Sequence, residues 1–186
     1  MKTIKSHSAG FTLIEAVITI SIVSILASIA IPSFSAMVEN NRISSASNDL
    51  LASLIYTRSE AAKRSQTVSI CTSSNSTSCS TALNDYAKGW IIFTDCDEDG
   101  VLDTTVTTCD VDGDGVLDAD KLLRVQEEIK NISMVSSLAS GQDSFSYDLS
   151  GRGSSALSFN IGPDATTTKR KISIAITGRA KLSTVD

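Results

Sequence analysis

The sequence predicts an α+β protein, in which one long N-terminal helix precedes a β-rich C-terminal region. Residues 11–64 carry apolar side chains in a pattern typical of a continuous helix. Beyond residue 65 the helical period disappears, and short segments rich in β-branched and aromatic residues are bounded by Gly, Ser and Asp. With 186 residues, 41% of them hydrophobic, the chain is long enough for one domain with a hydrophobic core.

The first part of the predicted helix is apolar enough to cross a membrane. Residues 11–31 are apolar or small except for Glu15, and these twenty-one residues span roughly 32 Å as a helix. Lys2 and Lys5 precede them, which places the N-terminus on the cytoplasmic side. The alternative is an ordinary secretory signal that is cleaved and discarded. Glu15 argues against it, because a carboxylate in a membrane segment costs about 2.5–3.5 kcal/mol unless it has a partner.

From residue 33 to residue 64 the pattern stays helical but becomes amphipathic. Apolar residues at steps of three and four predict one face, which we expect the rest of the head to cover. The residues predicted for this face are Phe34, Met37, Val38, Leu50, Leu51, Leu54, Ile55 and Ala62.

Seven short strands are predicted after the helix, at residues 67–71, 90–94, 122–126, 132–136, 145–149, 156–161 and 171–177. The last is the clearest, because Ile172, Ile174 and Ile176 alternate with small or polar residues. A further extended segment after Gly178 would pair with it, since glycine allows a tight turn there.

The segment Ala9-Gly10-Phe11-Thr12-Leu13-Ile14-Glu15 resembles the leader junction of type IV prepilins and type II secretion pseudopilins. The resemblance implies that prepilin peptidase cuts after Gly10 and that Phe11 becomes the methylated N-terminus. It assigns Glu15 to pairing with a protonated N-terminal amine during filament assembly. It also implies the type IV pilin fold, with a leader at residues 1–10, a helix at 11–64 (transmembrane 11–31, amphipathic 33–64) and a secreted head at 65–186.

Three head segments are similar to the GspH/FimT group of minor pilins: residues 57–64 (Thr-Arg-Ser-Glu-Ala-Ala-Lys-Arg), 68–71 (Val-Ser-Ile-Cys) and 89–95 (Gly-Trp-Ile-Ile-Phe-Thr-Asp). This similarity implies a minor pilin that acts near the tip of a type IV pilus or primes its assembly, with other pilins as partners. A single inner-membrane span would hold it, head in the periplasm, before it enters the extracellular pilus. The alternatives are a DNA-binding minor pilin for natural transformation and a pseudopilin of type II secretion.

Four cysteines fall into two close pairs. Their spacings are unlike those of zinc or redox sites, so we expect two disulfides formed in an oxidising compartment, with four unpaired thiols as the alternative. Nearest neighbours close short loops with little rearrangement, which predicts the pairs Cys71–Cys79 and Cys96–Cys109.

The sequence argues against an enzyme that needs a histidine base. The only histidine is His7, which would leave with the leader, so the mature chain would hold no Ser-His or Cys-His pair. We therefore expect no catalytic residues and no required cofactor.

Ten acidic residues and no basic residue lie between positions 95 and 120. They form two incomplete EF-type loops, each with aspartates at positions 1, 3, 5 and 9 and a glycine at position 6. We expect at least one weak calcium site here, because clustered carboxylates repel one another without a cation. The alternative is a pair of Asp-Gly turns solvated by water. The candidate ligands are Asp95, Asp97, Asp99, Asp103, Asp110, Asp112, Asp114 and Asp118.

Five basic residues and no acidic residue lie between positions 169 and 181. Arg179 and Lys181 are two residues apart, so on a strand they project from one face. Their sequence resembles the DNA-contact element of FimT-type pilins, which implies weak binding of double-stranded DNA. The alternative is a solvated basic edge that discourages aggregation.

Overall fold

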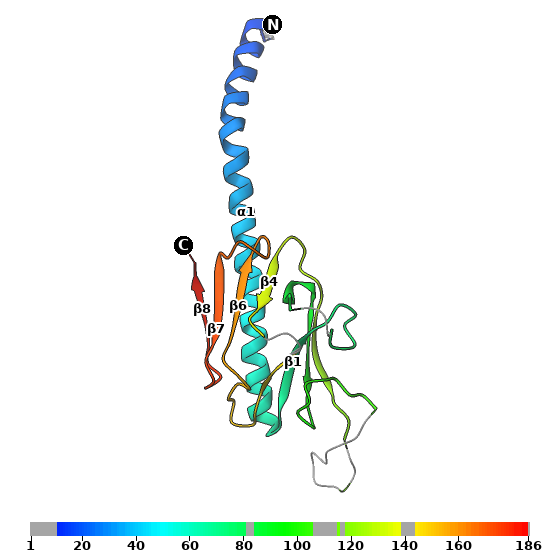
Figure 1. Cartoon of the computed structure of the whole chain (residues 1–186). Coiled ribbons are helices and arrows are strands. Elements are labelled where there is room, and N and C mark those ends of the chain that lie inside the picture. Colours follow the sequence, from blue (N-terminus) through cyan, green and yellow to red (C-terminus); the bar gives the residue numbers. More distant parts are fainter. Residues whose placement is uncertain (1–10, 81–83, 106–114, 116–117, 139–143, 186) are drawn as a thin grey trace, which may run out of the picture. The chain divides into compact units, whose positions relative to one another are not determined.

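The computed structural model describes residues 11–80, 84–105, 115, 118–138 and 144–185 (Figure 1). The chain divides into two compact units, the first ending at Asn40 and the second beginning at Asn41. Helix α1 (Leu13–Arg64) contributes residues to both, and every described strand belongs to the second.

The first unit carries the apolar part of α1. Every large apolar side chain of residues 11–31 is exposed, and the mean hydropathy of the most apolar window is 2.4. By length and composition this helix could cross a membrane. The helix starts after Thr12, whose hydroxyl accepts a hydrogen bond from the Glu15 N–H at 3.3 Å, as an N-cap residue does.

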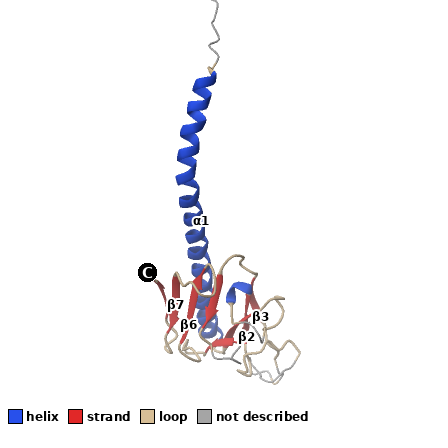
Figure 2. Ribbon diagram, turned by 45° about the horizontal axis from the view of Figure 1, so that its top comes forward, coloured by secondary structure: helices blue, strands red, loops and turns tan. Residues whose placement is uncertain are grey.

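The second unit contains two antiparallel sheets of four strands each (Figure 2). Sheet A has the strand order β3-β2-β1-β5, formed by β3 (Leu122–Gln126), β2 (Trp90–Thr94), β1 (Val68–Thr72) and β5 (Ser144–Tyr147). Sheet B has the order β4-β6-β7-β8, formed by β4 (Ser133–Ser136), β6 (Leu157–Gly162), β7 (Arg170–Ile174) and β8 (Ala180–Thr184).

All seven predicted strands are confirmed, with small differences at their ends. β8 is the strand expected after Gly178, and it pairs antiparallel with β7. One detail of the prediction is wrong. Ile172 and Ile174 are buried, but Ile176 is 53% exposed because β7 ends at Ile174 and Ile176 lies in the turn that follows.

The core of the second unit lies where both sheets meet buried residues of α1. Its largest members are aromatic although the chain has few aromatic residues, and Tyr86 meets Phe159 edge-on with ring centroids 5.0 Å apart. Tyr86 begins the 3₁₀ helix η1 (Tyr86–Lys88), which the Asp85 carboxylate caps at the Ala87 N–H. Asp85 also accepts hydrogen bonds from the Met134 N–H and the Ser133 hydroxyl, so it ties η1 to β4.

The buried face of α1 differs in part from the predicted one. Leu50 and Leu54 are fully buried as expected. The residues of the predicted face that are exposed instead are Phe34, Met37, Val38, Ile55 and Ala62. Four of the nine buried residues of α1 are polar or charged. The nine are Ile43, Ala46, Ser47, Leu50, Ser53, Leu54, Thr57, Glu60 and Ala61. Ser47 and Thr57 are tolerated there because each hydroxyl donates to the carbonyl four residues earlier, at 2.6 and 2.8 Å.

The predicted disulfide Cys71–Cys79 is confirmed. It joins the end of β1 to the Ser- and Thr-rich segment that follows, and Cys71 is fully buried. Closing such a short loop contributes roughly 2–3 kcal/mol of stability in the chain-entropy account. Cys96 is disulfide-bonded as well, and its predicted partner, Cys109, lies outside the described residues.

Candidate functional site

Glu15 is the acidic residue of the first turn of α1, within an otherwise apolar segment. Its side chain is exposed, like those of Phe11 and the other large apolar residues of this segment. The three ion pairs that join described side chains do not include Glu15. A lone carboxylate on an apolar helix surface needs a partner from outside the helix once that surface is buried.

The acidic loop begins at Asp95, directly after β2. Asp95 is 1% exposed, and its Oδ2 accepts hydrogen bonds from the Ser69 hydroxyl and from the Gly100 N–H, the latter at 3.1 Å. Its Oδ1 is also buried, and no described residue donates a hydrogen bond to it. Ligand atoms of Asp95, Asp97 and Asp99 lie within 4.8 Å of one another, with Asp97 and Asp99 exposed. The structure therefore brings three carboxylates together, and one of them carries a buried oxygen that has no donor among the described residues.

The two ends of the acidic segment are held together by residues that motif spacing did not single out. Asp120 accepts from the Cys96 N–H at 2.9 Å and from the Asp103 N–H at 3.0 Å. Thr94, the last residue of β2, accepts a hydrogen bond from the Lys121 N–H at 2.7 Å and donates its own N–H to the Lys121 carbonyl at 3.0 Å. These bonds hold the backbone on both sides of Asp95 at the end of β2.

Burial changes the acidity of both carboxyl groups. It raises the pKa of Asp95 to about 6, against the lowering effect of the Ser69 hydroxyl, and the charges of Asp120 and Asp99 raise it further. Burial also raises the pKa of Asp120, against the lowering effect of the hydrogen bonds that it accepts from the Asp103 and Cys96 backbone N–H groups. Sequence spacing could not distinguish Asp95 from its exposed neighbours, since burial depends on where β2 lies in the sheet.

The other predicted calcium ligands lie outside this cluster or outside the described residues. Asp103 and Asp118 are described but are not members of the cluster of three. Asp110, Asp112 and Asp114 lie outside the described residues. The structure thus brings together three of the four aspartates predicted for the first loop, and the second loop stays a prediction.

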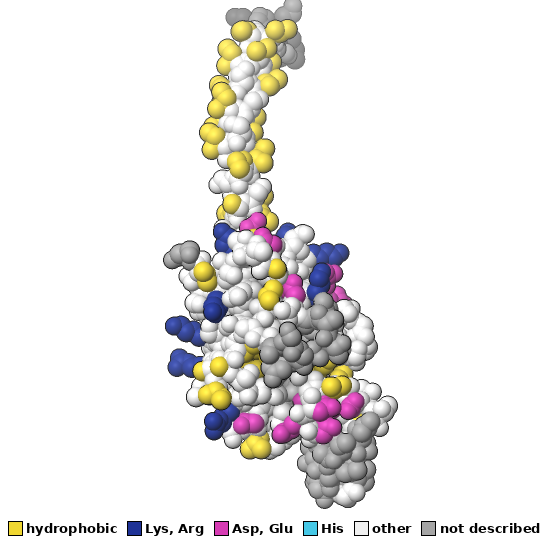
Figure 3. Space-filling model, in the orientation of Figure 1, with side chains coloured by type: hydrophobic (Ala, Val, Ile, Leu, Met, Phe, Trp, Pro, Cys, Tyr) yellow, Lys and Arg dark blue, Asp and Glu magenta, His cyan; other side chains and the backbone are white. Residues whose placement is uncertain are grey.

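Basic residues gather on the β7–β8 edge of the head, where Figure 3 shows Lys and Arg side chains in dark blue. Lys181 lies opposite Ser173 in the strand register, on the outer face of sheet B and away from buried Ile172. Arg179 precedes β8 and is also exposed. Arg170 belongs to the inner side, because its guanidinium donates to the Ser44 hydroxyl at 2.8 Å.

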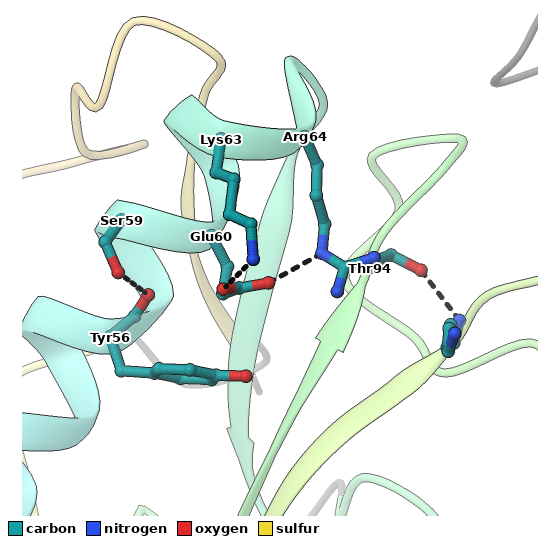
Figure 4. Close-up of polar contacts among 7 residues, drawn as sticks. Tyr56, Ser59, Glu60, Lys63, Arg64 and Thr94 are labelled. Carbon is teal, nitrogen blue, oxygen red and sulfur yellow. Dashed lines mark hydrogen bonds and ion pairs between the residues drawn. The ribbon is translucent and has the colours of Figure 1, made fainter.

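The charged end of α1 has a structural role. Glu60 accepts from Arg64 Nε at 2.7 Å and lies 3.6 Å from Lys63 Nζ, as Figure 4 shows. The hydrogen bond from Arg64 lowers the pKa of Glu60. One turn earlier, Arg58 donates to the carbonyls of Gly151 and Thr177, at 2.8 and 3.2 Å. This arginine therefore connects α1 to two loops of the head.

Comparisons with known proteins agree with the fold. Residues 46–178 match the family described as type II transport protein GspH, and residues 5–31 match the prokaryotic N-terminal methylation motif. Two crystal structures of the type IV minor pilin FimU from Pseudomonas aeruginosa are similar. One has a TM-score of 0.53 at 24% identity and covers 78% of this chain and 90% of FimU. The other has a TM-score of 0.51 at 21% identity, covering 75% and 91%. No curated protein sequence matches the chain.

Proposed function

This chain belongs to the GspH family of pilin-like proteins, and we propose that it is a minor pilin of a type IV pilus that enters the filament near its tip and primes assembly. The carrying observation is the uncovered, largely apolar surface of residues 11–31, in which Glu15 is the only charged residue. Such a surface needs an apolar environment, which a bilayer supplies before assembly and other apolar helices supply in a filament. The methylation motif over residues 5–31 supports processing by prepilin peptidase and assembly with other pilins.

Two further observations support a subunit present in few copies. The fold is that of FimU, which is a type IV minor pilin in Pseudomonas aeruginosa. In addition, ten acidic residues between positions 95 and 120 give each head a concentrated negative charge. Repeating that charge along a filament would bring like charges together, whereas one or a few copies at an end avoid this repulsion.

Deleting the gene is expected to reduce surface pili and twitching motility strongly, while secretion of exoproteins stays normal. Pili would be counted by electron microscopy of sheared fractions, and immunogold labelling of the remaining filaments in a complemented strain should place the subunit at filament ends. A plasmid copy carrying Gly10→Ala is the matched control, since an uncleaved prepilin should not restore pili. Normal pili with lost exoprotein secretion would instead make the protein a type II secretion pseudopilin.

A second candidate function, capture of double-stranded DNA, is favoured by the exposed basic edge of the head. Lys169, Arg179 and Lys181 are exposed there. Two or three cations on one strand edge can contact a phosphate backbone without reading bases. Binding of this kind would be weak, independent of sequence and strongly dependent on salt.

A mobility-shift experiment tests DNA binding directly. The detergent-solubilised mature chain is expected to shift duplex DNA at low salt, and Arg179→Ala with Lys181→Ala should remove the shift because few phosphates are neutralised. Lys121→Ala with Lys130→Ala makes the same change in net charge at two exposed positions, one just before β3 and one after it. This double variant should leave the shift intact. No shift for the unmodified chain, or an equal loss in both double variants, would contradict a DNA site at this edge.

A further inference from the structure

The buried carboxylate of Asp95 has an oxygen that is unpaired among the described residues, which indicates a ligand. A buried acceptor without a donor is costly, and the large majority of buried side-chain polar atoms in proteins have a hydrogen-bond partner. Asp95 Oδ2 already accepts two hydrogen bonds, from Ser69 and Gly100, whereas Oδ1 accepts none from any described residue. Oδ1 is therefore the oxygen that is available to a ligand from outside the described residues.

The charge around Asp95 indicates what that ligand is. One carboxylate oxygen each of Asp95, Asp97 and Asp99 lies within 4.8 Å of the other two, so three acidic groups are close together. A water molecule could donate a hydrogen bond to Oδ1 but would leave the mutual repulsion of these groups unchanged. A bound cation would both pair with Oδ1 and offset the repulsion among the three carboxylates.

We propose that Asp95, Asp97 and Asp99 form a Ca²⁺ site, with Asp95 Oδ1 as its buried ligand. All three candidate ligands are hard oxygen donors, which suit Ca²⁺ rather than zinc or copper. The spacing matches positions 1, 3 and 5 of an EF-type loop, with Gly100 at position 6. Gly100 has a φ of +78°, the left-handed conformation that lets the loop turn sharply, and its N–H holds the other oxygen of Asp95.

Hydrogen bonds from the surrounding structure fix the conformation of the loop that carries the proposed site. Thr67, beside β1, donates its hydroxyl to Glu98 at 2.7 Å and accepts the Asp95 N–H on its carbonyl at 3.0 Å. Both carboxylate oxygens of Asp120 accept hydrogen bonds, one from the Cys96 N–H and one from the Asp103 N–H. Asp120 therefore holds the loop backbone in place. Occupation of the site would tie the loop to the ends of β1 and β2 and stabilise sheet A.

Thermal unfolding of the full mature chain in nonionic detergent tests the site. After treatment with chelator, about 10 mM Ca²⁺ is expected to raise the Tm by about 5–10 °C, if the dissociation constant is near the 10⁻⁴ M of extracellular modules. Calorimetric titration with Ca²⁺ should give a dissociation constant in the same range. Mg²⁺ at equal concentration should give a smaller rise, because it demands a stricter geometry and keeps its waters.

Asp97→Asn is the decisive variant, since Asp97 is exposed and its replacement leaves the buried contacts of Asp95 in place. It should weaken Ca²⁺ binding at least about tenfold and remove most of the rise in Tm, because the charge of the ligands sets the affinity. Asp49→Asn makes the same change in charge at an exposed position of α1 and should retain both responses. An undiminished response in Asp97→Asn, equal responses to Mg²⁺ and Ca²⁺, or no response to Ca²⁺ would each overturn the proposal. These results are independent of whether the protein acts in a pilus.

Discussion

Replacing Glu15 with alanine is expected to leave the leader cleaved but to keep most of the subunit out of the filament. If the Glu15 carboxylate pairs with a protonated N-terminal amine, as its place in the motif implies, removing it leaves that amine buried without a partner among apolar helices. Breaking one side of a buried ion pair costs about 3–5 kcal/mol, and every 1.4 kcal/mol is tenfold in an equilibrium. We therefore expect the subunit to be depleted from sheared filaments by at least roughly tenfold, as measured by immunoblot.

Two variants make the Glu15 result specific. Glu15→Gln keeps the size and polarity of the side chain without its charge, so it should be depleted like the alanine variant. Glu39→Ala removes an exposed carboxylate from the same helix and should enter filaments normally. Mass analysis of the membrane fraction should find N-methylated Phe11 at the start of all three chains. Normal incorporation of Glu15→Ala would remove the pairing from the mechanism of assembly.

Replacing Gly178 with alanine is expected to destabilise the head by about 3 kcal/mol or more, because two penalties coincide at this turn. Its φ of +79° is a conformation that costs a residue with a side chain about 1–2 kcal/mol. An added Cβ would also meet the Gly151 carbonyl oxygen at 1.9 Å, so backbone would have to move. The same carbonyl accepts the 2.8 Å hydrogen bond from Arg58, so its displacement would weaken the link to α1 as well.

Thermal unfolding of the solubilised mature chain measures this effect, with an expected drop in Tm on the order of 10 °C. Thr177→Ala is the matched control in the same turn. Thr177 is exposed, and Arg58 contacts only its backbone carbonyl, so this variant should unfold within a few degrees of the unmodified protein. A Gly178→Ala protein as stable as Thr177→Ala would mean that the turn can move away from Gly151 at little cost.

The features that sequence could predict depend on residues close together in the chain. The apolar run with its single carboxylate, the leader junction and the period-two strands are local patterns, because each follows from the preferences of a few adjacent residues. The disulfide Cys71–Cys79 belongs with them, since eight residues separate its members. For the same reason, the fold class and the family could be inferred before any coordinates.

The buried face of α1 is a case in which the local pattern was only partly informative. Ile55 and Ala62 continue an apolar stripe along the helix yet are exposed, whereas Ser47 and Thr57 are buried. Polar residues of this kind can be buried in a helix because their hydroxyls bond to the preceding turn. Which stripe packs inward is decided by the strands that cover it, and no three- or four-residue spacing contains that information.

The sequence by itself determined that this protein has an apolar assembly helix, a disulfide-bonded β-rich head and an acidic loop with the spacing of a calcium site. Tertiary structure alone decided which of the acidic residues are buried and which hold the loop by hydrogen bonds. Asp95 is buried because it follows the central strand β2, and Asp120 holds the loop because β3 pairs beside that strand. The physical reason is that burial and hydrogen bonding depend on neighbours far away in the chain, whereas spacing records only neighbours along it.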